Sequence, residues 1–271
     1  MEIAYLTRIM NEEDLIYYHL KFHYNLGIRA FFITFNNSNQ ETIALVEKFF
    51  GEYTDARLFK FYEKSTSYTQ SEQFDLMSKD AYEKGYKWQV PLDADELVKI
   101  GNGLSLQGNL KRFDKHHHGH IDLKWFNYNH TEDSGDNSDP NYFTRWQHRD
   151  EKEWGYTKII YKWAPGNKHG YGHHSMIANQ HLIGVIPPSE MFIAHFRSRN
   201  QEQLRKKVIR IGEAFIERFG IGSTTPQVQT YKRWKEQGDT FFDDLWEKTC
   251  ADRRKRRSAM VHDPIDKRMF E

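Results

Sequence analysis

Residues 88–96 read WQVPLDADE, an apolar run that leads directly into three acidic side chains. The run predicts a buried strand, with Asp93, Asp95 and Glu96 at its carboxyl end. It is the fourth apolar run of an alternating series, after those at 3–6, 30–35 and 57–62. Strands that alternate with helices favour βαβ units, so we expect an α/β fold whose mainly parallel sheet carries helices on both faces.

The segments between these runs carry helix signals. Asn11 stands where an N-cap belongs, ahead of three acids, and Gly27 stands where a C′ glycine ends a helix. Further helices are expected over 42–50 and 67–84, each followed by a glycine. The first hundred residues therefore predict a regular alternation of strands and helices.

The second half of the chain is less regular. Strands are expected over 115–129, 157–163 and 191–196, a polar loop over 131–139, and long helices over 200–219 and 231–249. Asp139 followed by Pro140 predicts a helix start, because Pro is favoured at the first helical position.

The composition excludes several classes of protein. The 271 residues suit one large domain, or one domain with an appendage. A net charge of +1 provides no general basic field, so we expect no nucleic acid as a partner. Cys250 is the only cysteine, which excludes an intramolecular disulfide and a cysteine-based zinc site.

The basic residues gather toward the C-terminus, where residues 197–257 hold 16 Lys and Arg against 9 Asp and Glu. Residues 253–257 (RRKRR), with Arg205, Lys206, Lys207 and Arg210, form either a solvated face or a contact with an anionic membrane surface. No window approaches ~18 apolar residues and the N-terminus lacks the apolar stretch of a signal peptide. We therefore expect a cytoplasmic protein that is either free or peripheral on the inner face of the membrane.

The acidic turn after the fourth strand is the strongest chemical signal. In open α/β sheets, ligands bind outside the carboxyl ends of the strands. Asp93 and Asp95, one residue apart on a turn there, can share a hard divalent cation that also takes phosphate oxygens. Such a cation neutralises the charge that develops on a leaving diphosphate. The alternative is that these acids only begin a helix.

Several stretches resemble the family 2 glycosyltransferases, which are inverting enzymes of the GT-A fold. The matching stretches are 8–14 (RIMNEED), 35–39 (FNNSN), 68–70 (YTQ), 88–96 (WQVPLDADE), Lys158 with 172–174 (GHH), and 195–198 (HFRS) with Glu202, Gln203 and Lys206. The chain departs from the family in having Arg8-Ile9-Met10 where a Lys usually stands, and Asn36 or Asn37 where an Asp often stands.

The resemblance implies a fold and a division of the chain. The fold is α/β of the GT-A type, with a Rossmann-like mixed sheet flanked by helices and a C-terminal helical extension. Residues 1–199 form the catalytic domain, with a nucleotide-sugar half (1–100) and an acceptor half (101–199). Residues 200–271 form the basic helical extension.

The resemblance also implies which residues bind the substrates. The nucleotide-sugar site comprises Thr7, Arg8, Asn11, Glu12, Asn36, Asn37, Gln70, Asp93, Ala94, Lys158 and His174. Mn²⁺ or Mg²⁺ is bound by Asp93, Asp95 and His195. A neutral imidazole suits Mn²⁺ better than Mg²⁺, although His195 is equally consistent with a core histidine of a late strand.

An inverting transfer needs one general base that takes the proton of the acceptor hydroxyl. Asp139 and Glu153 are rival candidates, and the sequence does not separate them. Asp139 is also consistent with a plain N-cap, and Glu153 with a solvated surface acid.

The sequence therefore predicts a metal-dependent inverting glycosyltransferase. It would move a sugar from a nucleotide diphosphate sugar, with a UDP-sugar favoured, to a glycan or lipid-linked glycan. The family suggests bacterial surface polysaccharide or lipopolysaccharide synthesis. The alternatives are a non-catalytic protein that binds nucleotide sugar or glycan, and a nucleotidyltransferase. The latter would need a Gly-rich basic loop after the first strand, where this chain has Asn11-Glu12-Glu13-Asp14.

Overall fold

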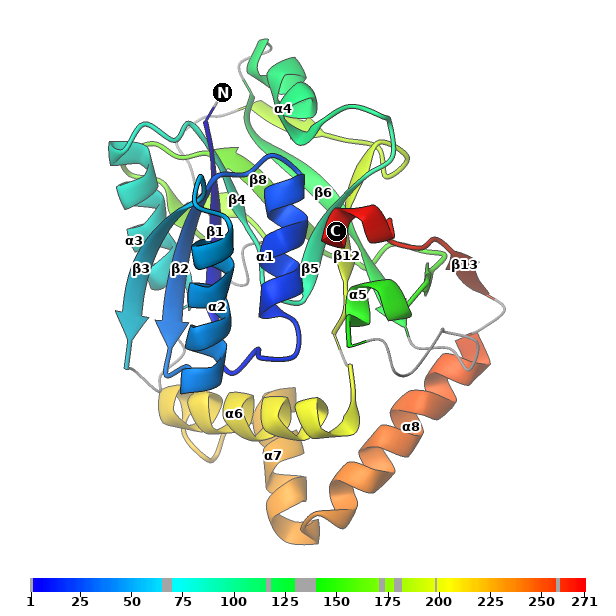
Figure 1. The fold of residues 1–271 in the computed structure, drawn as a ribbon. Coiled ribbons are helices and arrows are strands. Elements are labelled where there is room, and N and C mark those ends of the chain that lie inside the picture. The colour runs from blue at the N-terminus through cyan, green and yellow to red at the C-terminus, as the bar shows by residue number, and fades with distance from the viewer. Residues whose placement is uncertain are drawn as a thin grey trace.

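The computed structural model describes residues 2–64, 70–115, 118–129, 140–170, 174–177, 182–197, 199–256 and 259–271. Within them the chain forms one large mixed sheet between helices, with further helices below it (Figure 1). The expected fold class is confirmed: a mixed α/β sheet flanked by helices, with a C-terminal helical extension. Among the described residues, no helix is both long and apolar enough to cross a membrane.

The N-terminal half alternates strands and helices as expected. Its elements are β1 (Ile3–Ile9), α1 (Ile16–Asn25), β2 (Ala30–Asn36), α2 (Gln40–Glu52), β3 (Arg57–Glu63), α3 (Gln70–Glu83), β4 (Trp88–Pro91) and β5 (Glu96–Ile100). Strands β4, β1, β2 and β3 lie side by side in that order, and all are parallel. Their carboxyl ends therefore meet at one edge, where ligands bind in sheets of this kind.

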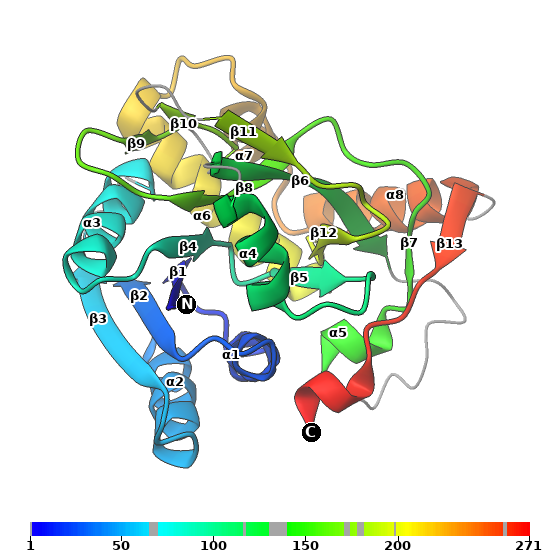
Figure 2. The same ribbon diagram turned by 90° about the horizontal axis from the view of Figure 1, so that it is seen from above.

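Alternate residues of these strands pack on opposite faces of the sheet. Tyr5 and Phe31 face the large core with α1 and α2, whereas Leu6 and Phe32 face a smaller core with α3. Figure 2 shows α1 and α2 on one side of the strands and α3 on the other. Because both faces are covered, the parallel strands are continuous apolar runs, as in the fully buried AFFITFN of β2.

The second half makes the sheet mixed. Its elements are α4 (Leu106–Lys115), β6 (His118–Asn129), α5 (Tyr142–Arg145), β7 (His148–Asp150), β8 (Thr157–Lys162), β9 (Lys168–His169), β10 (Met176–Ile177), β11 (Leu182–Val185) and β12 (Met191–His195). Strand β8 lies antiparallel between β4 and β6. Strand β12 is antiparallel to β5 and parallel to β6, which brings His195 beside Glu96 and Asn127.

The C-terminal part consists of α6 (Gln201–Phe219), α7 (Pro226–Gln237), α8 (Thr240–Arg256), β13 (Met260–His262) and the short helix η3 (Lys267–Phe270). Figure 1 shows α6 crossing below the carboxyl ends of β2 and β3, with α7 and α8 beyond it. The chain then returns to the sheet, where β13 pairs with β7 and Phe270 packs against Phe22 of α1. The division at residue 199 stays a prediction.

Three local expectations are wrong. Helix α1 begins at Ile16 rather than after Asn11, whose φ of 52° places it in a loop. Helix α5 has only four residues and its N-cap is Asn141 rather than Asp139. The single helix expected over 231–249 is two, because Gly238, at a φ of 70°, ends α7 before α8 begins.

Candidate active site

The acidic turn joins β4 to β5 at the carboxyl edge of the parallel strands. The Glu96 amide donates to the Asp93 carbonyl (3.1 Å), and the Asp93 amide donates to the Glu96 carboxylate (3.1 Å). The Phe196 amide, just after β12, donates to the Asp95 carbonyl (2.8 Å). The turn is thereby fixed to two strands, and it presents Asp93 and Asp95 at the edge that the sequence predicts.

Both oxygens of the Asp93 carboxylate have polar partners. Gln70, the first residue of α3, donates to Oδ1 from Nε2 at 2.9 Å, and Lys158 of β8 donates to Oδ2 at 2.9 Å. The Asp93 side chain is 35% exposed, whereas that of Lys158 is 1% exposed. The structure thus brings Asp93, Gln70 and Lys158 together, and their role in a nucleotide-sugar site stays a prediction.

Glu96 shares the buried ammonium of Lys158, at 3.1 Å between Oε1 and Nζ. Burial and the neighbouring carboxylates of Asp93 and Asp95 raise the pKa of Glu96 to about 8, against the opposing effect of Lys158. Lys158 therefore contacts two carboxyl groups at once. A buried charge of this kind is tolerated because it is paired.

The Asp95 carboxylate is surrounded by basic groups. Its Oδ2 lies 3.1 Å from Lys207 Nζ of α6, 3.6 Å from His195 Nε2 and 3.8 Å from Arg199 Nη1. Burial alone would raise the pKa of Asp95, but Lys207, His195 and Arg199 hold it well below its usual range. Asp95 is therefore a buried anion at neutral pH.

His195 lies beside that anion. Its Nδ1 lies 3.0 Å from Asn127 Oδ1, and the Asn127 amide donates from Nδ2 to Asp150 (3.4 Å). Burial lowers the pKa of His195 to about 4, against the opposing effect of Asp95, so the ring is neutral at pH 7. Its Nε2 lies 3.6 Å from Asp95 Oδ2, so an imidazole nitrogen and a carboxylate oxygen lie next to each other at the acidic turn.

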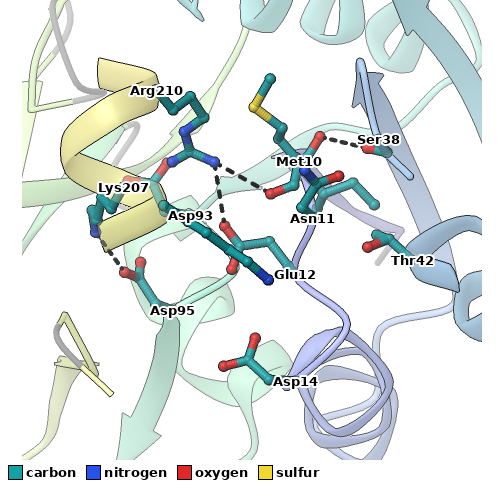
Figure 3. A network of polar contacts seen from close by, with 12 residues as sticks. Met10, Asn11, Glu12, Asp14, Ser38, Thr42, Asp93, Asp95, Lys207 and Arg210 are labelled. Atoms are coloured by element: carbon teal, nitrogen blue, oxygen red, sulfur yellow. Dashed lines mark hydrogen bonds and ion pairs between the residues drawn. The ribbon is translucent and has the colours of Figure 1, made fainter. Parts of the chain in front are cut away.

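The first loop is held to this site by Arg199. The guanidinium donates to Asp14 from Nε (2.7 Å) and to Glu12 from Nη2 (2.7 Å), and its side chain has no exposed surface. Figure 3 shows Glu12 between Asp95 and Arg210 of α6, whose Nη1 donates to the Met10 carbonyl (3.2 Å). Burial raises the pKa of Glu12 although Arg199 and Arg210 oppose this.

The loops after β1 and β2 are joined at the same edge. Asn11 Oδ1 accepts from the Asn39 amide (2.8 Å), and Ser38 Oγ donates to the Ile9 carbonyl (2.9 Å; Figure 3). Asn37 has a φ of 47° and its amide donates to the Glu63 carbonyl of β3 (3.1 Å). These loops lie where the nucleoside is expected.

The other predicted residues of this half are buried or paired. Thr7 and Asn36 are buried in β1 and β2, and Ala94 is buried in the acidic turn. Arg8 donates from Nε to Glu63 of β3 at 2.8 Å. The Arg8 guanidinium is thereby positioned at the ends of β1 and β3.

Trp125 of β6 connects His174 with the metal-site candidates. Its ring centroid lies 5.5 Å from that of His174 and 4.3 Å from that of His195. His174 Nδ1 lies 2.6 Å from the Thr157 carbonyl, and burial lowers the pKa of His174. The His174 and His195 rings therefore both lie against Trp125, and whether His174 belongs to the same site stays a prediction.

The structure describes only one of the two candidates for the general base. Glu153 lies on the surface, 46% exposed, with its carboxylate 3.6 Å from Lys124 Nζ. Asp139 lies outside the described residues, as do Tyr68, Thr69, Gly172, His173 and Ser198 of the matching stretches. The identity of the base stays a prediction.

The described residues contain no group of three or more His, Cys, Asp or Glu that could hold a metal ion as they stand. The chemistry of the acidic turn nevertheless fits a divalent cation, because it offers two carboxylates and an imidazole 3.6 Å from one of them. Lys158 and Lys207 contact those carboxylates instead. A bound ion would therefore require these side chains to rearrange.

Sequence reasoning misses Arg199, Asn127 and the role of α6. It assigns Lys206, Lys207 and Arg210 to a basic face, yet Lys206 contacts Glu13 (3.3 Å) and the other two contact the site. The one available signal is position, since Arg199 directly precedes Asn200, the N-cap of α6. The side chains of the remaining basic run, 253–257, lie outside the part of the chain that the structure describes.

No family model matches the sequence, and no curated protein matches it. The structure is similar to a mannosyltransferase from Pyrobaculum calidifontis in complex with GDP-Man and Mn²⁺, with 12% identity, a TM-score of 0.48, and coverage of 95% of this chain and 82% of the other. It is also similar to a UDP-glucose pyrophosphorylase complexed with UDP-glucose, with 9% identity, a TM-score of 0.32, and coverage of 74% of this chain and 92% of the other. Both likenesses concern the fold, so the function is inferred from the residues of the site.

Proposed function

We propose that the protein is a metal-dependent inverting glycosyltransferase that takes its sugar from a nucleotide diphosphate sugar. The observation that supports the proposal is the acidic turn at the carboxyl edge of the sheet, where Asp93 contacts Lys158 (2.9 Å) and Asp95 lies 3.6 Å from His195. This edge is where open α/β sheets bind nucleotides. The proposal agrees with the resemblance of the sequence to family 2 glycosyltransferases.

The donor lies along the ends of β1, β2 and β4 in this proposal. The loops that contain Asn11 and Asn37 hold the nucleoside, and Gln70 and Lys158 lie toward the phosphates. Asp93, Asp95 and His195 would hold Mn²⁺ or Mg²⁺, which would supply positive charge to the diphosphate leaving group. A UDP-sugar is the favoured donor.

Helix α6 adds protein cations to the same place. Lys207 contacts Asp95, and Arg210 lies 3.9 Å from Glu12. When the diphosphate enters, these two side chains can move from the carboxylates to the phosphate oxygens, since both groups accept the same hydrogen bonds. The donor thereby replaces internal ion pairs with contacts to itself.

Transfer with inversion needs an acceptor hydroxyl opposite the leaving group and a base to take its proton. Asp139 and Glu153 remain the candidates for that base. The acceptor is a glycan or a lipid-linked glycan, and the setting that the family suggests is surface polysaccharide or lipopolysaccharide synthesis on the cytoplasmic face of the membrane.

The test is release of nucleotide diphosphate from UDP-, GDP- and dTDP-sugars with Mn²⁺ and with a chelator. We expect release that requires the metal, and Asp95→Asn should lower it at least 100-fold, whereas Asp55→Asn on the exposed surface should not. Formation of a nucleoside triphosphate and a sugar 1-phosphate when pyrophosphate is added to the same donors would instead identify a nucleotidyltransferase. Binding of a nucleotide sugar without turnover would identify a non-catalytic protein.

A further inference from the structure

A pocket of about 420 Å³ lies between the end of β6 and the three C-terminal helices. Helices α6, α7 and α8 supply most of its lining, and the loop before β8 adds the indole of Trp154. The volume falls within the range of roughly 300–1,000 Å³ that is typical of small-ligand sites. The function proposed above assigns no role to this pocket.

The pocket adjoins the acidic turn. Lys207 and Asn127 line it, and these two residues contact Asp95 (3.1 Å) and His195 (3.0 Å) directly. Arg197, two residues beyond His195, also lines the pocket. A molecule in the pocket would therefore lie against the site at which the sugar is released.

The lining combines an aromatic face with polar groups. Trp154 is 40% exposed, an unusual position for so large an apolar side chain. Asn129, Gln227 and Thr230 offer amide and hydroxyl groups, and Arg197 forms no hydrogen bond or ion pair with a described residue. An indole covers the C–H face of a pyranose, and hydrogen-bonding groups around it meet the hydroxyls at the rim of the ring.

We propose that this pocket binds a sugar ring of the acceptor glycan, with the ring stacked on Trp154. The inference rests on the proposed transfer to a glycan and names where that glycan binds. It also gives the C-terminal helices a function, because α7 and α8 pack on α6 and complete the pocket on the side away from the sheet. Arg197 then acts as a specificity residue at the rim.

The inference is tested with methyl glycosides of glucose, galactose, mannose, N-acetylglucosamine and glucuronic acid as probes. Saturation-transfer NMR would measure their binding to the full chain and to Trp154→Ala, Thr230→Trp and Tyr82→Ala. Thr230→Trp fills the pocket, and Tyr82 is an exposed aromatic residue of α3 (44% exposed) outside it. Unfolding midpoints show that each variant is folded.

We expect at least one glycoside to bind the wild type and Tyr82→Ala alike, and to bind both pocket variants at least 10-fold more weakly. If no glycoside binds, or if binding survives both pocket variants, the inference is wrong. Thermal stabilisation by UDP or GDP with Mn²⁺, measured on the same proteins, separates the two proposals. Nucleotide binding without glycoside binding contradicts the pocket alone, and glycoside binding without nucleotide binding contradicts the donor site alone.

Discussion

Arg199 determines the charge balance of the candidate active site. Its buried guanidinium bonds to Glu12 and Asp14 and lies 3.8 Å from Asp95, so one permanent cation serves three carboxylates. An arginine does not lose its proton in a protein. It therefore keeps the first loop attached to the acidic turn whatever the protonation state of Glu12.

Two buried histidines behind the acidic turn predict how stability depends on pH. Burial lowers the pKa of His23 to about 3, and burial lowers that of His19 as well. An unfolded histidine takes up a proton below about pH 6.5, whereas these two stay neutral in the folded state. Their stabilisation is complete above pH 6.5 and is lost as the pH falls toward their folded pKa values.

For His23 alone the loss is about 1 kcal/mol per pH unit, or roughly 2 kcal/mol between pH 6.5 and 4.5. Urea unfolding over this pH range should show that the free energy of unfolding of His23→Phe falls less steeply with decreasing pH than that of the wild type. The exposed His262 provides the control, since the free energy of unfolding of His262→Gln should fall with pH as steeply as that of the wild type. Equal slopes for wild type and His23→Phe would show that His23 takes up a proton in the folded protein.

Helix α6 places a lysine at the proposed metal site. Lys207 Nζ lies 3.1 Å from Asp95 Oδ2, and two cations at one carboxylate oxygen repel each other. We therefore expect Lys207→Met to bind Mn²⁺ alone several-fold more tightly than the wild type, measured by calorimetry. Lys206→Met is the matched control, because Lys206 contacts only the rim residue Glu13 among the ion pairs that the structure describes. Unchanged or weaker Mn²⁺ binding in Lys207→Met would refute a shared site.

The packing of α7 on α6 depends on Gly212. A Cβ atom at Gly212 would lie 2.6 Å from Tyr231 Cγ, so Gly212→Ala must separate the helices and should lower stability by about 1–3 kcal/mol. At Gly51, in α2, a Cβ atom would meet no other atom within 4 Å. Gly51→Ala should therefore raise stability, by up to about 1 kcal/mol. Urea unfolding measures the stability of both variants. A change of the same sign in the two free energies of unfolding would be inconsistent with this packing.

Residues 259–271 pack back against the sheet and against helices α1 and α5. Asp263 accepts from Arg149 at 2.8 Å and forms an ion pair with Lys99 of β5. Burial alone would raise the pKa of Asp263, but Lys99 and Arg149 lower it below its usual value. Phe270 packs against Phe143, with ring centroids 6.0 Å apart. The segment after α8 thereby contacts β5, β7, α5 and α1, which lie far from it in the sequence.

The order of the elements is predictable because the strands are long apolar runs. All residues of β2 and β4 are buried, and their local sequence is enough to predict each strand. The start of α1 is not predictable, because Asn11 and its neighbours are held in a loop by Arg199, which lies 185 residues from Asp14. Local helix signals are therefore overridden by a long-range ion pair.

Sequence separation also explains which parts of the candidate site could be predicted and which could not. Asp93 and Asp95 follow directly after a strand, so their position at the sheet edge can be inferred from sequence order. Lys207 contacts Asp95 across 112 residues, and only the path of α6 across the strand ends brings it there. Helical periodicity predicts which residues share a face of α6, but it does not predict what that face contacts.

Thermal unfolding with nucleotide diphosphate sugars tests the central claim most directly. UDP- and GDP-sugars should be compared with Mn²⁺ and with a chelator, on the wild type and on Asp95→Asn. A donor at ~100 times its Kd should stabilise the wild type by about 2.7 kcal/mol, only with the metal and not in Asp95→Asn. Stabilisation that survives both the chelator and Asp95→Asn, or none by any donor, would contradict a metal-dependent donor site at the acidic turn.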